Sequence, residues 1–192
     1  MSNPQDARSW KLFKVGDVFS LIKKSRVYHK TNLRPTKSGV PYISRTNFNN
    51  GLEDFCENEN FKKNPANTIV FGAENATFFF QSFEYITGNS MCFIQDKRIK
   101  CYTGLFISTS LNQSIRNCGF GYGKGLTGMR IKSRYISLPI DDAGQPDWEF
   151  MENHMRRIER KLLARYKKYL KLLEHIENSE RGRGIKTRLE RI

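Results

Sequence analysis

Residues 146–178 read PDWEFMENHMRRIERKLLARYKKYLKLLEHIEN, and after the first residue neither Gly nor Pro interrupts the run. Asp147 is a suitable N-cap residue. Glu149 and Glu152 place negative charge in the first turns, where a helix dipole favours it. The pattern therefore predicts one uninterrupted helix over residues 147–178, roughly 48 Å long at 1.5 Å per residue.

Apolar side chains recur along this predicted helix at alternating steps of 3 and 4, a spacing typical of a coiled-coil seam. A second apolar stripe lies beside the first in the later half. One alternative is that the helix packs onto its own domain, but it would overhang a domain roughly 30–35 Å across. We therefore expect a partner helix, and we assign the dimer interface to Met151, Met155, Ile158, Leu162, Tyr169 and Leu172.

The 192-residue chain carries a net charge of +14, which points to a polyanionic partner. Residues 147–192 hold 13 Lys and Arg against 8 Asp and Glu, so the basic excess is not confined to this part of the chain. Nucleic acid is the first expectation for the partner, and an anionic membrane surface is the second. The alternative is a generally basic protein with no such partner.

Four cysteines occur without a CxxC pair or a closely spaced His, a pattern that argues against a zinc site. The polar start resembles no signal peptide, and no apolar run approaches membrane-spanning length. We expect a cytoplasmic protein that has reduced thiols, binds no metal and has no membrane partner.

The expected fold class is α+β, in which a β-rich domain with short helices precedes one long C-terminal helix that forms a coiled coil. The β-rich domain covers residues 1–140 and the helix residues 147–178. A basic tail covers residues 179–192, because Gly182 and Gly184 indicate a break.

Within the first domain, β-branched and aromatic runs predict strands, and turn residues separate them. A short helix at Val18–Ile22 and a basic loop over residues 23–39 precede most of the strands, and a helix is predicted at Tyr102–Asn117. The predicted strands lie near Trp10–Val15, Val40–Ser44, Leu52–Phe55, Thr68–Phe71, Thr77–Gln81, Met91–Ile94, Met129–Ile131 and Tyr135–Leu138.

Two phrases place polar side chains at the ends of predicted strands: GVPYISRTNFNNG (39–51) and FGAENATFFFQ (71–81). Arg pairs with guanine edges and Asn with adenine edges through two hydrogen bonds each. The alternative is that both phrases form ordinary tight turns, and composition alone favours that. Our candidates for base contacts are Arg45, Asn47, Asn49, Asn75, Thr77 and Gln81.

Residues 119–125 form a glycine-rich loop that contains Lys124, and we assign Lys124 and Arg130 to phosphate contacts. The loop matches neither a P-loop nor a dinucleotide fingerprint, and a plain surface loop is an equal alternative. Asp147 and Glu159 mimic part of a nuclease pattern, but about 18 Å of helix separates them and they cannot share an ion. We therefore assign no catalytic or metal-binding residue.

Four phrases, read in order, resemble the specificity subunits of type I restriction-modification systems and those of some type II systems. They are WKLFKVGDVFSLIKK (10–24), GVPYISRTNFNNG (39–51), FGAENATFFFQ (71–81) and RYISLPIDDAGQPDWEFME (134–152). The resemblance covers roughly residues 10–165. It implies a target recognition domain that reads one half of a split DNA site, followed by a helix that packs antiparallel against its counterpart.

The usual subunit of that family carries two recognition domains and two helices, whereas this chain carries one of each. The resemblance thus implies a half-subunit that acts on double-stranded DNA as a homodimer or beside another specificity chain. It also implies a DNA methyltransferase subunit as partner, with a restriction subunit as a possible further one. The subunit itself would bind no cofactor, because S-adenosylmethionine would belong to the methyltransferase, which flips the target adenine.

Two other classes of function stay open. One is a protein that mimics a specificity subunit and binds methyltransferase without reading DNA. The other is a DNA-processing nuclease of unfamiliar type.

Overall fold

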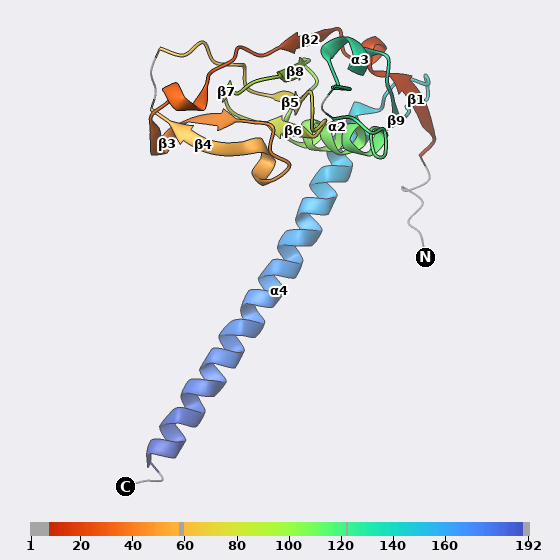
Figure 1. Cartoon of the computed structure of the whole chain (residues 1–192). Helices are drawn as coiled ribbons and strands as arrows, with labels where there is room; N and C mark the ends of the chain where they lie inside the picture. The colour runs from red at the N-terminus through yellow and green to blue at the C-terminus, as the bar shows by residue number, and fades with distance from the viewer. Residues whose placement is uncertain (1–7, 58–59, 122, 190–192) are drawn as a thin grey trace. The chain divides into compact units, whose positions relative to one another are not determined.

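The computed structural model describes residues 8–57, 60–121 and 123–189, with side chains up to Ile176. The chain divides into two compact units, Met1–Glu152 and Asn153–Ile192. The first unit contains every strand in the described part of the chain, and the second consists of the greater part of one helix (Figure 1). The expected α+β class is confirmed.

Three sheets build the first unit. The largest has the strand order β2-β8-β5-β6 and is antiparallel throughout, the second has the order β4-β3-β7, and the third pairs β1 with β9. The strands are β1 (Trp10–Lys14), β2 (Leu21–Lys24), β3 (Pro35–Ile43), β4 (Leu52–Cys56), β5 (Thr68–Gly72), β6 (Phe78–Gln81), β7 (Ile86–Thr87), β8 (Met91–Gln95) and β9 (Tyr135–Pro139).

The main core forms where the two larger sheets meet. β5 has the sequence TIVFG and is buried along its whole length, as expected for a central strand covered on both faces. Ile43 of β3, Val70 of β5 and Met91 of β8 belong to one buried cluster with Tyr85. The hydroxyl of Tyr85 finds its partner in Thr68 Oγ1 at 2.9 Å, so this buried polar group is satisfied.

The helices of the first unit are α1 (Val15–Val18), α2 (Cys101–Ser114) and α3 (Gly128–Lys132), with 3₁₀ turns η2 (Lys30–Asn32) and η3 (Asn49–Gly51). α2 packs on β6, and the ring of Phe80 approaches the helix closely at Gly104. A Cβ atom added there would overlap the ring of Phe80. Glycine is therefore required by space at this point of the helix.

Gly104→Val is expected to lower the free energy of unfolding by about 3 kcal/mol, because the added methyl groups force α2 away from β6. Gln113→Val puts the same side chain on the exposed side of α2 and should cost about 0.5 kcal/mol or less. Thermal unfolding followed by circular dichroism measures both. Equal losses for the two variants would contradict this close packing.

The structure confirms several predicted elements. β5 and β6 form the expected hairpin, with Phe71 opposite Phe78, and β4 returns antiparallel to β3. The helix expected at Tyr102–Asn117 is α2, and the strand expected at Tyr135–Leu138 is β9.

Three predictions near sheet edges were wrong. Leu21 and Ile22 do not extend a helix over Val18–Ile22, because they pair with β8 and complete the large sheet, and the helical turn α1 ends at Val18. Residues 23–39 are not one basic loop, since they contain the end of β2 and the start of β3. The third concerns Met129–Ile131, which lies in α3.

α3 forms because Thr127 caps it. The hydroxyl of Thr127 accepts a hydrogen bond from the backbone N–H of Arg130 at 3.3 Å. Short apolar runs cannot distinguish helix from strand by periodicity, so the cap decides the conformation.

The first turn of α4 (Trp148–Leu189) is part of the first unit. Asp147 caps it as predicted, because its Oδ1 accepts a hydrogen bond from Phe150 N at 2.8 Å. The guanidinium of Arg98 lies 4.5 Å from the ring centroid of Trp148 and is held by Asp96 at 2.7 Å. Burial raises the pKa of Asp96, but hydrogen bonds from Arg98 outweigh this effect, and the pKa lies below its ordinary value.

The burial of Met151 corrects one predicted interface residue. Its side chain has no exposed surface, so it anchors α4 in its own domain and cannot contact a second chain. Trp148, three residues before Met151, likewise packs edge-on against Phe19. The periodic apolar pattern therefore combines two contacts: its first residues are internal, and the later ones are available to a partner.

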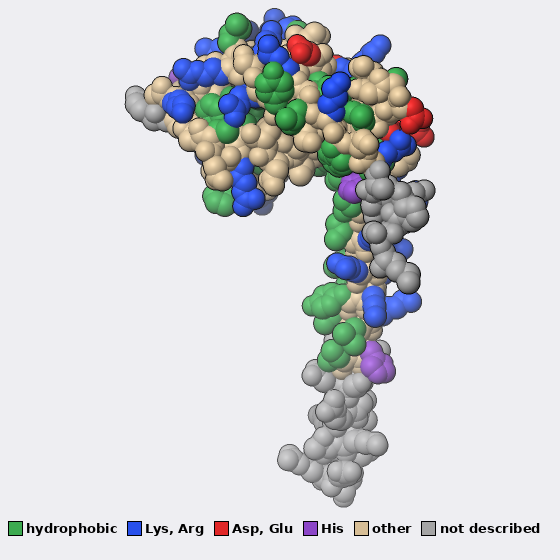
Figure 2. All heavy atoms as spheres, turned by 90° about the vertical axis from the view of Figure 1, so that its right-hand side faces the viewer, with side chains coloured by type: hydrophobic (Ala, Val, Ile, Leu, Met, Phe, Trp, Pro, Cys, Tyr) green, Lys and Arg blue, Asp and Glu red, His purple; other side chains and the backbone are tan. Residues whose placement is uncertain are grey.

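The part of α4 in the second unit carries large apolar side chains in contact with solvent, which recur along the helix (Figure 2). Met155 is half-buried, and Ile158 is 36% exposed. The remaining predicted interface residues are 55–57% exposed: Leu162, Tyr169 and Leu172.

The helix continues to Leu189 and does not end at Asn178. Gly182 and Gly184 lie within it, because a glycine costs a helix only about 1 kcal/mol and no proline is present to stop it. Side chains from residue 177 onward lie outside the described ones, so the basic tail remains a prediction. Within the described residues, no helix is both long and apolar enough to cross a bilayer.

Candidate nucleic-acid interface

The first candidate loop, residues 44–51, joins β3 to β4 and turns sharply. Asn49 and Asn50 adopt left-handed backbone conformations with φ of 49° and 52°, which Asn tolerates better than most residues. Gly51 follows with φ of 79°, and Ser44 N donates to Gly51 O at 3.0 Å to close the loop. Polar side chains that follow a buried strand are thereby displayed at the surface of a fixed turn.

The second candidate loop, residues 72–77, joins β5 to β6, and Asn75 ties it to the first. Its Nδ2 lies 3.1 Å from the carbonyl oxygens of Arg45 and Thr46 and 2.8 Å from Asn47 Oδ1. Thr77 Oγ1 also donates to Asn47 Oδ1, at 2.7 Å. Four of the six predicted base-contact residues are thus brought together although about 30 residues separate them in sequence.

We call the hydrogen bonds from Asn75 Nδ2 to the first loop the clasp. Glycine at position 72 leaves the space that the clasp needs. A Cβ atom there would overlap Asn75 Oδ1 and would lie 3.0 Å from Arg45 Cγ. Asn75 Oδ1 is buried and has no hydrogen-bond partner among the described residues. An unsatisfied buried oxygen has a free-energy cost, and the hydrogen bonds of Nδ2 offset it.

Arg45 also forms an ion pair with Glu74 across the two loops. The side chains are 35% and 39% exposed, so solvent screens the pair and its contribution to stability is small. Its importance is geometric, because Glu74 limits the directions in which the guanidinium can point. A preorganised guanidinium can donate two parallel hydrogen bonds to the O6 and N7 atoms of guanine.

Gln81 does not fit the predicted base-contact role. Its side chain is 8% exposed, and Nε2 donates to the Asn50 carbonyl at 2.9 Å. Asn50 Nδ2 donates in turn to Phe80 O at 3.0 Å. Gln81 and Asn50 therefore fasten the first loop to β6. The side chain of Asn49 is exposed, and its Nδ2 donates to Leu52 O at 3.2 Å.

A third segment, residues 123–130, reaches the second loop from the other side. Leu126 N donates to Ala73 O, and a Cβ atom at Gly125 would lie 3.1 Å from the same oxygen. Lys124 and Arg130 are both exposed, and Arg130 Nη1 donates to Gly125 O at 2.7 Å. The predicted phosphate contacts thus belong to the segment that adjoins the predicted base contacts.

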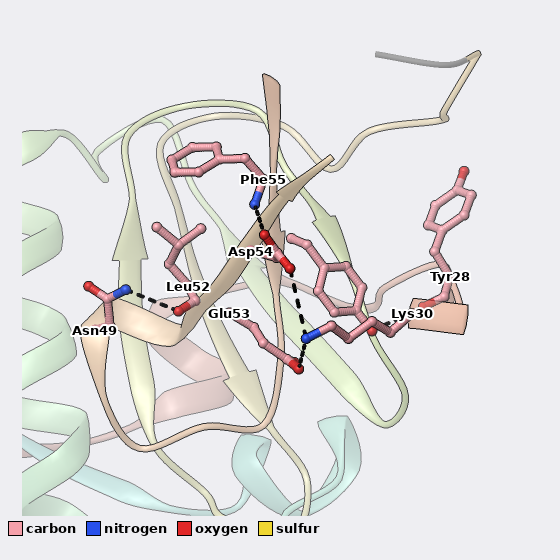
Figure 3. Close-up of polar contacts among 8 residues, drawn as sticks. Tyr28, Lys30, Asn49, Leu52, Glu53, Asp54 and Phe55 are labelled. Carbon is pink, nitrogen blue, oxygen red and sulfur yellow. Dashed lines mark hydrogen bonds and ion pairs between the residues drawn. The ribbon is translucent and has the colours of Figure 1, made fainter. Parts of the chain in front are cut away.

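A cleft of about 620 Å³ opens beside the first loop, with Tyr42, Ser44 and Arg45 among its lining residues. Lys30 Nζ lies in it, 2.8 Å from Glu53 Oε1 and 3.9 Å from Asp54 Oδ2 (Figure 3). The hydrogen bond from Lys30 lowers the pKa of Glu53, and Ser44 acts in the same direction. The mixed charge of this cleft does not favour a DNA phosphate.

The described residues include no group of three or more His, Cys, Asp or Glu side chains arranged to hold a metal ion. The interface instead consists of amides, hydroxyls and guanidinium groups on backbone turns held from both sides. Such a surface can hydrogen-bond to base edges in a groove.

Comparison with models of protein families shows the family of the chain. The model of the type I restriction modification DNA specificity domain matches residues 7–168. The chain belongs to this family. The match includes all the candidate loops and the first turns of α4.

Individual members of the specificity-domain family are also similar to the chain. The type II restriction enzyme specificity subunit S.BcgI of Heyndrickxia coagulans is 28% identical over 166 residues, which are 82% of this chain and 46% of that subunit. The chain therefore spans less than half the length of this curated relative.

Solved structures show the same specificity-domain fold. The type I S subunit of M. genitalium matches with a TM-score of 0.56 and 13% identity over 91% of this chain and 45% of that one. The HsdS subunit of Thermoanaerobacter tengcongensis matches with a TM-score of 0.52 and 10% identity over 81% and 38% of the two chains.

Two residues that position the candidate loops were not predicted from the sequence. They are Glu74, which pairs with Arg45, and Asn50, which donates to Phe80 O. Both act through partners about 30 residues away, and no local pattern signals such pairs. The sequence Asn49-Asn50-Gly51 predicts a turn, but it does not predict which residue Asn50 contacts.

Proposed function

We propose that the chain is the DNA recognition subunit of a restriction-modification methyltransferase and reads one half of a split site. The observation that carries the proposal is the clasp of Asn75 on Arg45, Thr46 and Asn47. It fixes two polar loops in one arrangement, which is what discrimination among base edges requires. The net charge of +14 supports the proposal, because phosphate contacts supply much of the affinity for DNA.

The base-reading residues in this proposal are Arg45, Asn47, Asn49 and Thr77, with Asn75 as the positioning residue. Each bidentate pairing discriminates against a wrong base by about 1–3 kcal/mol. Lys124 and Arg130 contact phosphates and set the register on the duplex. The chain itself performs no chemical step.

The proposal assigns pairing of two copies to α4. A helix that exposes a continuous row of large apolar side chains to water gains stability when a second helix covers them. We expect a partner helix to cover Ile158, Leu162, Tyr169 and Leu172. An antiparallel pair has a two-fold axis and presents two identical reading modules. The DNA site would then be an interrupted palindrome.

A methyltransferase subunit completes the proposed assembly. It would bring S-adenosylmethionine and flip the target adenine out of the duplex, while this chain determines which adenine is presented. In the proposed assembly, the amides and guanidinium groups of this chain bind and orient DNA, and the methyltransferase subunit performs the chemical step.

The test is to co-express the chain with its neighbouring methyltransferase in cells and to map the methylated adenines across the genome. The expected result is methylation within one split, palindromic motif that disappears when either protein is omitted. Binding of methyltransferase with no enriched motif, in cells and with randomised duplexes, would favour a mimic of a specificity subunit. Cleavage of plasmid by the purified chain with Mg²⁺ would indicate a nuclease.

A further inference from the structure

A second cleft, of about 500 Å³, lies beside β2 and β8 of the large sheet. One wall is the end of β2 with the residues that follow it, and the other is the segment 62–65. Among the described residues, no acidic side chain lines this cleft. Five cationic side chains line it: Lys23, Lys24, Arg26, Lys62 and Lys63. This composition is the opposite of that of the cleft beside Lys30.

Backbone hydrogen bonds hold both walls of this basic cleft in place. Ser25 N donates to Met91 O at 2.9 Å, which extends the pairing of β2 with β8. Asn64 N donates to Tyr85 O at 2.7 Å and fixes the opposite wall to the core. The cations are therefore presented on a scaffold that does not need to form when a ligand binds.

The five cations lack acidic partners. None of them forms an ion pair with any acidic side chain in the described part of the chain. Like charges gathered at one surface repel one another, and a bound polyanion relieves the repulsion. At the inner side of the cleft, Ser25 is 5% exposed, and its Oγ is a buried hydroxyl without a hydrogen-bond partner among the described residues. Buried hydroxyls are normally satisfied, so this one has a hydrogen bond to donate to an oxygen that enters the cleft.

The basic cleft adjoins the surface that carries the reading loops. Lys24 lines both the basic cleft and a neighbouring hollow of about 390 Å³. Ala73 and Lys132 also line that hollow, and Ala73 immediately precedes Glu74 in the second loop. Lys24, at the end of β2, is common to both hollows, so a ligand that contacts the residues of both must be longer than a single phosphate.

We propose that the basic cleft binds the sugar–phosphate backbone of duplex DNA next to the half-site that the loops read. Lys23, Lys24, Arg26, Lys62 and Lys63 neutralise phosphates, and the hydroxyl of Ser25 donates to a phosphate oxygen. The proposal rests on the proposed function and extends it, because it adds a backbone contact that the loops and residues 123–130 do not make. It predicts a DNA footprint longer than the bases that determine specificity.

The test compares Lys62→Gln/Lys63→Gln with Lys11→Gln/Lys14→Gln, a control that removes the same charge from exposed positions of β1 outside the cleft. Binding to a duplex with the genomic motif is measured between 50 and 300 mM salt. Each lost phosphate contact reduces the slope of log Kobs against log salt by about 0.9. The cleft variant should lose about 1.8 in slope and bind about sixtyfold more weakly near 100 mM salt, with an unchanged motif, and the control should keep the wild-type slope.

Ser25→Ala supplies a second readout. Removal of the Ser25 hydroxyl should leave the melting temperature of the protein unchanged, because the hydroxyl has no hydrogen-bond partner to lose among the described residues. It should weaken DNA binding about threefold at every salt concentration. Equal slopes for wild type and the Lys62/Lys63 variant, with intact motif binding, would overturn the cleft proposal and leave the proposed function standing. Competition by millimolar inorganic phosphate without any change of DNA slope would also overturn it, since the cleft would then take free phosphate. A wild-type chain that binds no duplex would overturn both.

Discussion

A chain with Ile158→Asp is expected to behave as a 22.4 kDa monomer at concentrations where the wild type has twice that mass. Ile158 lies on the exposed apolar face of α4 and should be covered by the partner helix. An aspartate there would leave an uncompensated charge in the interface at a cost of roughly 2–3 kcal/mol, and two-fold symmetry introduces it twice. The dissociation constant of the dimer should therefore rise by on the order of a thousand-fold or more.

Ala164→Asp is the matched control for that substitution. It introduces the same side chain into the same exposed stretch of helix, but about 120° around the helix axis from Ile158 at 100° per residue, away from the predicted interface. Analytical ultracentrifugation should give a dimer for Ala164→Asp and a monomer for Ile158→Asp. Circular dichroism of the near-ultraviolet region should show an unchanged first domain in both. An unaltered mass for Ile158→Asp would rule out this face as the interface.

Asn75→Asp is expected to reduce affinity for the specific duplex by about 100-fold or more, while affinity for random DNA falls only slightly. The substitution keeps the shape of the side chain but replaces the Nδ2 donor by an oxygen. That oxygen would face the Arg45 carbonyl, the Thr46 carbonyl and Asn47 Oδ1, and each of these is an acceptor. Repulsion among these oxygens, at roughly 1–3 kcal/mol for each unsatisfied buried group, should separate the two loops.

The added negative charge needs its own control, since it weakens binding to any DNA. Asn153→Asp adds the same charge at an exposed position of α4 and should affect specific and random duplexes equally. Fluorescence anisotropy with the two duplexes gives the ratio of affinities directly. A specificity ratio that stays at the wild-type value in Asn75→Asp would contradict the role of the clasp.

The fold class and the helix could be predicted because both depend on repeated local patterns. The β-branched and aromatic runs of β5 and β6, the cap at Asp147 and the steps of 3 and 4 along α4 are each visible within a few residues. The errors came where distant partners decide the structure. Leu21 and Ile22 form a strand because β8 offers its edge, and Met151 is internal because its own domain covers it.

The candidate site was predictable in residue type but not in arrangement. Asn47, Asn75 and Thr77 do meet in space, as a surface built from two turns would require. Nothing in the sequence distinguishes the exposed Asn47 from the buried Gln81, because both are amides near a strand end. Accessibility depends on which strand packs behind each amide, and only the assembled sheets provide that information.

The amide of Asn75 has a practical consequence for redesign. Asn75 makes three of the hydrogen bonds that join the two turns, so a graft that imports one turn from a relative would lose the donor or the acceptors of these bonds. New target preferences would then have to be transplanted as a matched pair of segments together with their glycine at position 72. Libraries that randomise the outward-facing positions, and keep Asn75 and Gly72 constant, should yield more folded variants than libraries that exchange either segment alone.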